Sequence, residues 1–166
     1  MLQDKLKNIV KECEGELRNI GIPFKENYYF LIFPPELMYK NLGTTWKEAD
    51  TIAINEILFN EKVDKKVLKQ VVIHELLHTC EGTKGHNTVW KNYAKTVNEK
   101  LGYNISTYAN FSDKEFPRDL LAQGAKYALK CEKCGAVRLY KVKTKTVNNP
   151  ENSACRQCGG NFKRIK

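Results

Sequence analysis

The sequence has 166 residues and a formal net charge of +9, and 42% of its residues are apolar and 28% charged. This composition excludes wholesale disorder, and the length suffices for one modest hydrophobic core with a small appendage. The longest strongly apolar run, Tyr28 to Phe33, is far shorter than the roughly 20 residues of a membrane helix, and the N-terminal stretch lacks the apolar core of a secretory signal. We therefore expect a monomeric protein without membrane contacts, in the cytoplasm or in the nucleus of a eukaryote, where paired cysteines more often bind metal than form disulfides.

The first third of the chain predicts one helix and a few short strands. Apolar residues recur at helical spacing from 2 to 20 and predict an amphipathic helix. Residues 28–33 are rich in aromatic and β-branched side chains and stop at a Pro-Pro pair, so they predict a buried strand. A second strand is predicted at Thr51–Asn55, and a weaker candidate surrounds Trp46.

Two further helices are predicted in the middle of the chain. Asp64 is a suitable N-cap for a helix running to about residue 80, and apolar side chains cover nearly all of its directions. Such a helix belongs inside the core. Asn87 or Thr88 caps the next helix, which carries its apolar residues on one face. Residues 104–126 show no clear periodicity and are expected to form a lid, a wrap or a linker.

The predicted buried helix carries a His-Glu-x-x-His motif. His74 and His78 are four residues apart, so both imidazoles project from one face of the helix and can reach a single Zn²⁺ ion. Glu75 projects near the same face, where it can act as general base on a water at the metal. The competing interpretation, ordinary buried histidines, requires hydrogen-bond partners for neutral imidazoles inside an apolar core. We therefore interpret the motif as a catalytic metal site.

His86 is the expected third metal ligand. It directly precedes the next predicted helix and so points toward the core, and three histidines leave a fourth coordination position open, as catalytic zinc requires. Glu81 or Glu99 is the alternative source of the third ligand. Cys80 points about 160° away from His78 around the helix, and we expect it to be a buried, inert thiol.

These residues resemble a known family. The run Val72–His78, followed by Gly85-His86 and an aromatic residue at Trp90, looks like the SprT-like zinc metalloproteases, whose eukaryotic relative Spartan cleaves proteins crosslinked to DNA. The family pattern also includes an upstream strand like Thr51–Asn55 and, in many members, a C-terminal zinc ribbon. The sequence is unlike the metzincins, because no H-x-x-G-x-x-H continues from His78.

The resemblance implies a zincin-like metalloprotease domain, with the HExxH helix buried against a small sheet. Carried over residue by residue, it implies His74, His78 and His86 as ligands of a catalytic zinc ion and Glu75 as the catalytic acid and base. The residue that stabilises the oxyanion is not identifiable from the sequence, and Tyr103 and Tyr108 are candidates.

A second metal site is predicted near the C-terminus. Four cysteines form the pattern C-x₂-C-x₂₀-C-x₂-C: Cys131, Cys134, Cys155 and Cys158. Two such pairs supply four thiolates to a tetrahedral zinc ion, and short strands are expected at 137–142 and 160–165. Because so short a segment cannot build a sufficient apolar core, zinc would supply much of its folding energy. A thioredoxin-like redox site is disfavoured, since no βαβ pattern surrounds the two pairs.

The ribbon segment is also strongly basic. Residues 131–166 carry nine basic and two acidic residues, a net charge of +7 out of the +9 of the whole chain. The residues expected to bind nucleic acid are Lys133, Arg138, Lys141, Lys143, Lys145, Arg156, Lys163 and Arg164. Contacts with phosphates, together with base stacking on Tyr140 or Phe162, favour DNA as a partner, with single strands preferred. A protein-docking ribbon and a merely solvated basic face are the alternatives.

The sequence thus predicts an α+β protein in three parts. These are a SprT-like zinc metalloprotease domain at 1–105, a linker or wrap at 106–126 and a small β zinc ribbon with four cysteines at 127–166, with two zinc ions per chain. The predicted function is that of a zinc metalloendopeptidase on protein substrates bound to nucleic acid, to which the ribbon recruits the enzyme. The alternative is a non-proteolytic, nucleic-acid-binding or transcription-associated protein. In that case a side chain would occupy the fourth coordination position of the zinc ion at the HExxH motif.

Overall fold

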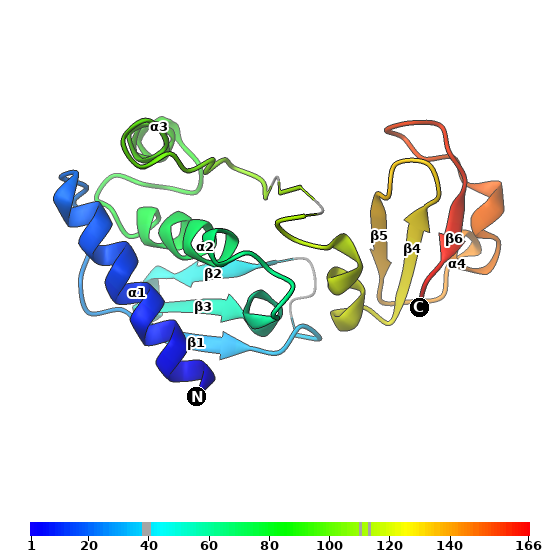
Figure 1. Ribbon diagram of the computed structural model, residues 1–166, viewed down its shortest axis with the longest axis horizontal. Helices are drawn as coiled ribbons and strands as arrows, with labels where there is room; N and C mark the ends of the chain where they lie inside the picture. Colours follow the sequence, from blue (N-terminus) through cyan, green and yellow to red (C-terminus); the bar gives the residue numbers. More distant parts are fainter. Residues whose placement is uncertain (38–40, 110, 113) are drawn as a thin grey trace.

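Two small sheets, one in each half of the chain, organise the structure (Figure 1). The computed structural model describes residues 1–37, 41–109, 111–112 and 114–166. The helices and strands are α1 (Leu2–Asn19), β1 (Tyr29–Phe33), β2 (Gly43–Trp46), β3 (Thr51–Asn55), α2 (Lys65–Leu77), α3 (Thr88–Leu101), β4 (Tyr127–Cys131), β5 (Val137–Tyr140), α4 (Lys145–Asn148) and β6 (Phe162–Arg164). The protein is a mixed α+β structure, as predicted. No helix in the described ranges is long and apolar enough to span a membrane.

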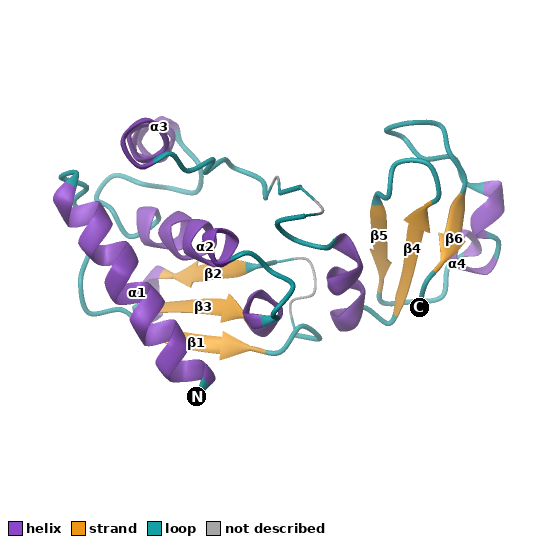
Figure 2. Cartoon of the chain, in the orientation of Figure 1, coloured by secondary structure: helices purple, strands orange, loops and turns teal. Residues whose placement is uncertain are grey.

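The first sheet has the strand order β1-β3-β2, with β1 parallel and β2 antiparallel to β3. Helices α1 and α2 lie on one face of this sheet (Figure 2). The central strand contributes Ile52 and Ile54 to the main core, which also contains Leu6 and Leu17 of α1. The alternation of side chains along each strand therefore directs every second residue toward the helices.

The prediction of a buried strand at residues 28–33 is wrong in one respect. The strand exists as β1, but it is an edge strand, and Tyr29 and Leu31 are 72% and 51% exposed. Both lie on the face of the sheet that α1 and α2 leave uncovered, whereas Phe30 and Ile32 pack on the core. A run of aromatic and β-branched residues indicates a strand, but it does not reveal whether both faces are covered.

Helix α2 is the buried helix that the sequence predicts. The Asp64 side chain caps it by accepting a hydrogen bond from the Lys66 N–H, and Val67, Val72 and Ile73 are fully buried on different sides. The helix ends at Leu77, a few residues earlier than predicted, and the chain turns back through residues 79–87.

Helix α3 follows directly, and Asn87 is its N-cap, because the Asn87 side chain accepts a hydrogen bond from the Trp90 N–H. Gly102 ends the helix in the left-handed conformation at φ 69°, which glycine adopts without strain.

The segment after α3 contacts both halves of the structure. Phe116 and Leu120 lie in the main core, and a 3₁₀ turn at Arg118–Gly124 packs against β4 and β5. Asp119 in this turn pairs with Lys130 of β4 at 2.8 Å. Figure 1 shows the turn between the two sheets.

The second sheet is antiparallel, with the order β5-β4-β6. Strands β5 and β6 correspond to the strands expected at 137–142 and 160–165, but the central strand β4 and the short helix α4 were not predicted. The core of this part is small: Leu129, Cys131, Cys155 and Phe162. So small an apolar core is below what usually stabilises a fold without a metal ion or disulfides.

Candidate metal centres and active site

Three histidines converge between α2 and the start of α3. Their Nε2 atoms face one another, at 3.3 Å between His74 and His78 and 2.9 Å between His74 and His86. A tetrahedral zinc ion with Zn–N bonds of roughly 2.0–2.1 Å would place its ligand nitrogens about 3.4 Å apart. The three side chains could therefore hold one metal ion, and their chemistry is consistent with zinc.

The other nitrogens of two of these rings are bound to the backbone. His74 donates to the Ser106 carbonyl and His78 to the Gly85 carbonyl. Because the Nε2 atoms face one another, the donors are the Nδ1–H groups, which fixes the tautomer that a metal ligand needs. Gly85 adopts a positive φ of 52°, which suits the tight turn that returns His86 to α2.

Burial keeps these rings neutral. Loss of solvent lowers the pKa of His74 to about 3 and that of His78 to about 4, and the neighbouring histidines add to the effect. The pKa of His86 is lowered as well, mainly by burial. Neutral imidazole is the form that binds a metal, so the site is ready for an ion near neutral pH.

Trp90 of α3 packs against all three imidazoles. It is fully buried, and the centre of its ring system lies 4.7 Å from His74, 5.5 Å from His78 and 4.5 Å from His86. One aromatic side chain thus restricts the orientation of all three imidazoles.

Glu75 lies beside the histidines and is almost completely buried, with 6% of its surface exposed. The Thr45 hydroxyl of β2 donates a hydrogen bond of 2.7 Å to its Oε2 atom. Burial raises the pKa of Glu75 to about 7, although the hydrogen bond from Thr45 acts in the opposite direction. A carboxyl group with this pKa can both accept and return a proton near neutral pH.

The three histidines and Glu75 line one cavity of about 630 Å³. One wall is formed by residues 41–45 at and before β2, and a second wall by the described residues from Asn104 to Phe111. Two side-chain contacts anchor the second wall: Gln70 of α2 accepts from the Asn104 N–H, and Asn98 of α3 bonds both backbone groups of Ile105.

The structure also places the residues that the sequence offered as other metal ligands or as oxyanion-stabilising groups. Glu81 and Glu99 are exposed and do not belong to the three-histidine group. Cys80 is buried, burial raises its pKa to about 11, and it lies in neither candidate metal group. Tyr103 is unsuited to stabilise an oxyanion, because its hydroxyl donates to Glu16 and its side chain does not line the cavity. Tyr108 does line the cavity.

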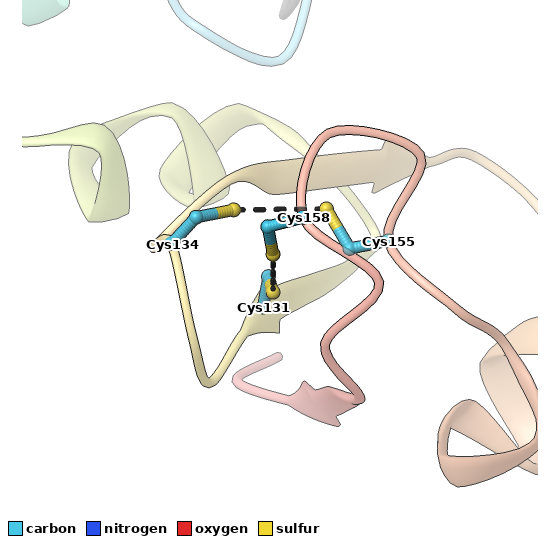
Figure 3. Close-up of side chains that lie close together, drawn as sticks. All are labelled: Cys131, Cys134, Cys155 and Cys158. Atoms are coloured by element: carbon cyan, nitrogen blue, oxygen red, sulfur yellow. Dashed lines mark hydrogen bonds between the residues drawn. The ribbon is translucent and has the colours of Figure 1, made fainter.

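The four cysteines form the second candidate metal centre (Figure 3). The Sγ atoms of Cys131 and Cys158 are 3.5 Å apart, and those of Cys134 and Cys155 are 3.6 Å apart. A disulfide would require about 2.05 Å, whereas four sulfurs around a zinc ion at 2.3 Å are separated by about 3.8 Å. Backbone N–H groups, first that of Cys134, lower the pKa of Cys131 to about 6, and the N–H of Gln157 lowers that of Cys155. Cys131 and Cys155 are therefore predisposed to the thiolate form that binds metal. For Cys134 the backbone N–H of Ala136 acts in the same direction, but hydrogen bonds with the other three cysteines raise its pKa to about 12.

A model of the SprT-like family matches residues 24–109. The chain belongs to the SprT-like family. The match spans the first sheet, α2, α3 and the three-histidine group, and it suggests a metallopeptidase-like domain. A search of curated proteins found no match. The four-cysteine part of this SprT-like chain lies outside the matched residues.

The basic residues of the ribbon are mostly exposed, but some have structural contacts. Lys133 donates to the Cys158 carbonyl, and the Arg138 guanidinium lies 4.2 Å from the centre of the Phe162 ring. Phe162 is 2% exposed and belongs to the small core, so the expectation that bases stack on it is wrong. Tyr140 is half-buried and remains accessible.

Three further residues shape the surroundings of the histidines and Glu75, although their local sequence gives no sign of it. They are Gly43 and Thr45, which contact Glu75, and the Ser106 carbonyl, which binds His74. Nothing in their local sequence distinguishes them, because their importance comes from contacts with α2, which is distant in the chain.

Proposed function

We propose that this SprT-like protein is a zinc-dependent metallopeptidase with a zincin-like catalytic domain, which hydrolyses peptide bonds in protein substrates. The observation that carries the proposal is the shared cavity of His74, His78, His86 and Glu75. Three neutral imidazoles with a carboxyl group beside them form the donor set and the base that metal-assisted hydrolysis requires.

The residues of the chain have distinct parts in this mechanism. The three histidines would hold a zinc ion, which when bound would supply Lewis-acid chemistry by activating water and polarising a carbonyl oxygen. Glu75 accepts the proton of the attacking water and passes it to the leaving amine, for which its pKa of about 7 is well matched. The substrate backbone binds in the cavity that the three histidines and Glu75 line. Tyr108, on the second wall, is the candidate to stabilise the oxyanion.

The non-proteolytic alternative requires a closed coordination shell. Across the described part of the chain, no cysteine, aspartate, glutamate or further histidine joins His74, His78 and His86 in their metal-binding group. Cys80 and Glu81, the two residues that could have closed the shell, lie outside it. An open fourth position favours the peptidase.

The replacement Glu75→Gln tests the proposal. Glutamine keeps the size of the side chain but cannot accept the proton, so zinc content and fold should persist while hydrolysis of an unfolded protein substrate falls at least about 100-fold. The matched control is Glu81→Gln, which removes an exposed carboxylate six residues away in the same region. Near-full hydrolysis by Glu75→Gln in zinc-loaded protein would contradict the assigned role.

We further propose that the four-cysteine ribbon holds a second, structural zinc ion and brings the catalytic domain to proteins bound to DNA. Most of the residues expected to contact DNA are exposed, among them Lys143, Lys145, Arg156 and Lys163. These cations lie on a part of the chain that carries +7 of the net charge of +9. Such a concentration of positive charge supports phosphate binding.

A further inference from the structure

The edge strand β2 contacts the Glu75 side chain through two of its four residues. In the register with β3, Gly43 pairs with Ile54 and Thr45 pairs with Ile52. Both isoleucines lie in the main core with α2. Because side chains alternate along a strand, positions 43 and 45 face α2. On the face of β2 that faces Glu75, position 45 therefore carries a hydroxyl group and position 43 carries no side chain.

Thr45 holds one oxygen of the carboxylate. Its Oγ1 atom is 2.7 Å from Glu75 Oε2 and 3.1 Å from the Glu75 backbone carbonyl oxygen. The hydroxyl thus contacts both the side chain and the main chain of one residue, which ties the carboxylate to a fixed place on α2. No described group donates a hydrogen bond to Oε1. This second oxygen is left for a molecule in the cavity.

Gly43 provides the space that the carboxylate occupies. A Cβ atom at this position would lie 2.8 Å from both Cγ and Oε1 of Glu75 and 3.0 Å from Cγ1 of Val71. Contacts this short do not occur between relaxed side chains, so any side chain at position 43 would force Glu75 to move. The backbone of Gly43 does not have a positive φ, so the requirement for glycine comes from the close approach of the Glu75 and Val71 side chains.

We propose that β2 positions the general base: Thr45 orients the Glu75 carboxylate through Oε2, and Gly43 leaves the room in which Oε1 stays free to accept the proton. The inference rests on the proposed peptidase function, because the orientation of Oε1 matters only if Glu75 takes part in hydrolysis. A base must lie within hydrogen-bond reach of the proton that it abstracts, and small displacements are costly. Thr45 and Gly43 are positioning residues, since neither needs to touch the substrate.

The test compares Thr45→Val with Thr45→Ser in zinc-loaded protein, using an unfolded protein or peptide substrate. Valine has nearly the same shape but no hydroxyl, and we expect kcat to fall about 10–100-fold while KM and zinc content stay within twofold. Serine keeps the hydroxyl and should restore most of kcat. Gly43→Ala should also lower kcat and keep zinc. The matched control is Thr51→Val on the neighbouring strand, because the Thr51 hydroxyl donates only to the Ala49 carbonyl and lies outside the cavity.

Crystal structures of the wild type and of Thr45→Val provide a readout that does not depend on activity. We expect the Glu75 carboxylate to leave its present position in the variant while the three histidines stay in place. An unchanged carboxylate, an unchanged kcat or a loss of zinc in Thr45→Val would overturn the positioning role and leave the peptidase proposal intact. A wild-type protein without hydrolytic activity would overturn both, so the two failures are distinguishable.

Discussion

At the scale of single residues, burial is the main influence on the chemistry of the histidine site. It lowers the pKa of His74 and His78 far below 6.5 and raises that of Glu75 to about 7, so near neutral pH these two histidines are neutral while Glu75 can gain or lose a proton. These opposite shifts share one cause, since loss of solvent disfavours whichever form of a group is charged. A site with these properties binds a cation without competition from protons.

We predict that His86→Ala weakens zinc binding without unfolding the protein. His86 lies in the turn before α3 and is half-buried, so its removal leaves the core intact, but the metal loses one of its three protein ligands. Replacements that only support a ligand cost 10–100-fold in affinity, so we expect a loss of at least about 100-fold here. Competition with a coloured zinc chelator measures this affinity, with Glu81→Ala as control. Equal zinc affinity in His86→Ala and the wild type would instead indicate a glutamate as third ligand.

At the scale of secondary structure elements, α1 and α2 are joined by a cluster of charged groups. Lys69 of α2 has only 14% of its side chain exposed and pairs with Glu16 and Glu12 of α1. Tyr103, just after α3, donates a hydrogen bond of 2.8 Å to the same Glu16. The cluster therefore links α1, α2 and the segment just after α3.

We predict that Lys69→Met lowers the free energy of unfolding by about 1–3 kcal/mol, because it removes the mostly buried cation that Glu12 and Glu16 share and leaves only Lys65 beside Glu12 and Tyr103 beside Glu16. Burial disfavours the charged form of Lys69, but the hydrogen bonds and charge interactions with Glu16 and Tyr103 together outweigh it and raise the pKa above its ordinary value of 10.5. Burial also raises the pKa of Tyr103 to about 12. Both groups bind protons more tightly in the folded state, so their stabilisation is complete below pH 10 and is lost as the pH rises toward 12.

Urea unfolding of both proteins at pH 8 and pH 11 checks this prediction. The matched control is Lys65→Met, since Lys65 pairs with Glu12 in the same region but has 61% of its side chain exposed, and its loss should cost less than about 0.5 kcal/mol. A similar loss for both variants would show that the burial of Lys69 does not matter.

The same elements show what the sequence could predict. Helix α2 and its cap were predicted correctly, because one apolar pattern and one aspartate specify them locally. The sequence did not predict the exposed face of β1 or the existence of β4. Both features depend on packing between segments that are distant in the sequence. The two candidate metal-binding groups can be predicted from the spacing of their motifs. Thr45 and Gly43 contact Glu75 from a different element, β2, so the sequence near Glu75 does not reveal them.

At the scale of the whole molecule, the two candidate metal centres belong to different hydrophobic cores. The three histidines lie against the large core and the four cysteines within the small one. Replacing Cys131 and Cys134 with serine should therefore unfold residues 127–166, reduce the zinc content from two ions to one and leave peptide hydrolysis in place. Limited proteolysis together with metal analysis measures this. Loss of both zinc ions would mean that the large core depends on the ribbon.

The uneven distribution of charge gives the last prediction, which concerns DNA binding. Lysines and arginines that contact phosphates release counterions, so affinity should fall steeply with salt and depend little on sequence. Reversal of Lys141, Lys143 and Lys145 to glutamate should weaken binding at low salt at least about 10-fold and flatten the salt dependence, while zinc content stays the same. Titration of fluorescent single- and double-stranded DNA at two salt concentrations measures both quantities.

The matched control for this reversal is the same change at Lys5, Lys7 and Lys11, which are exposed on α1 and alter the net charge of the chain equally. If the local concentration of charge on the ribbon determines binding, only the ribbon variant should lose affinity; if net charge alone does, both should lose it equally. Since Phe162 is buried, Tyr140 is the one of the two expected stacking residues that bases can reach, and Tyr140→Ala should reduce any preference for single strands. Wild-type protein that binds no DNA even at low salt would leave the ribbon as a protein-docking module.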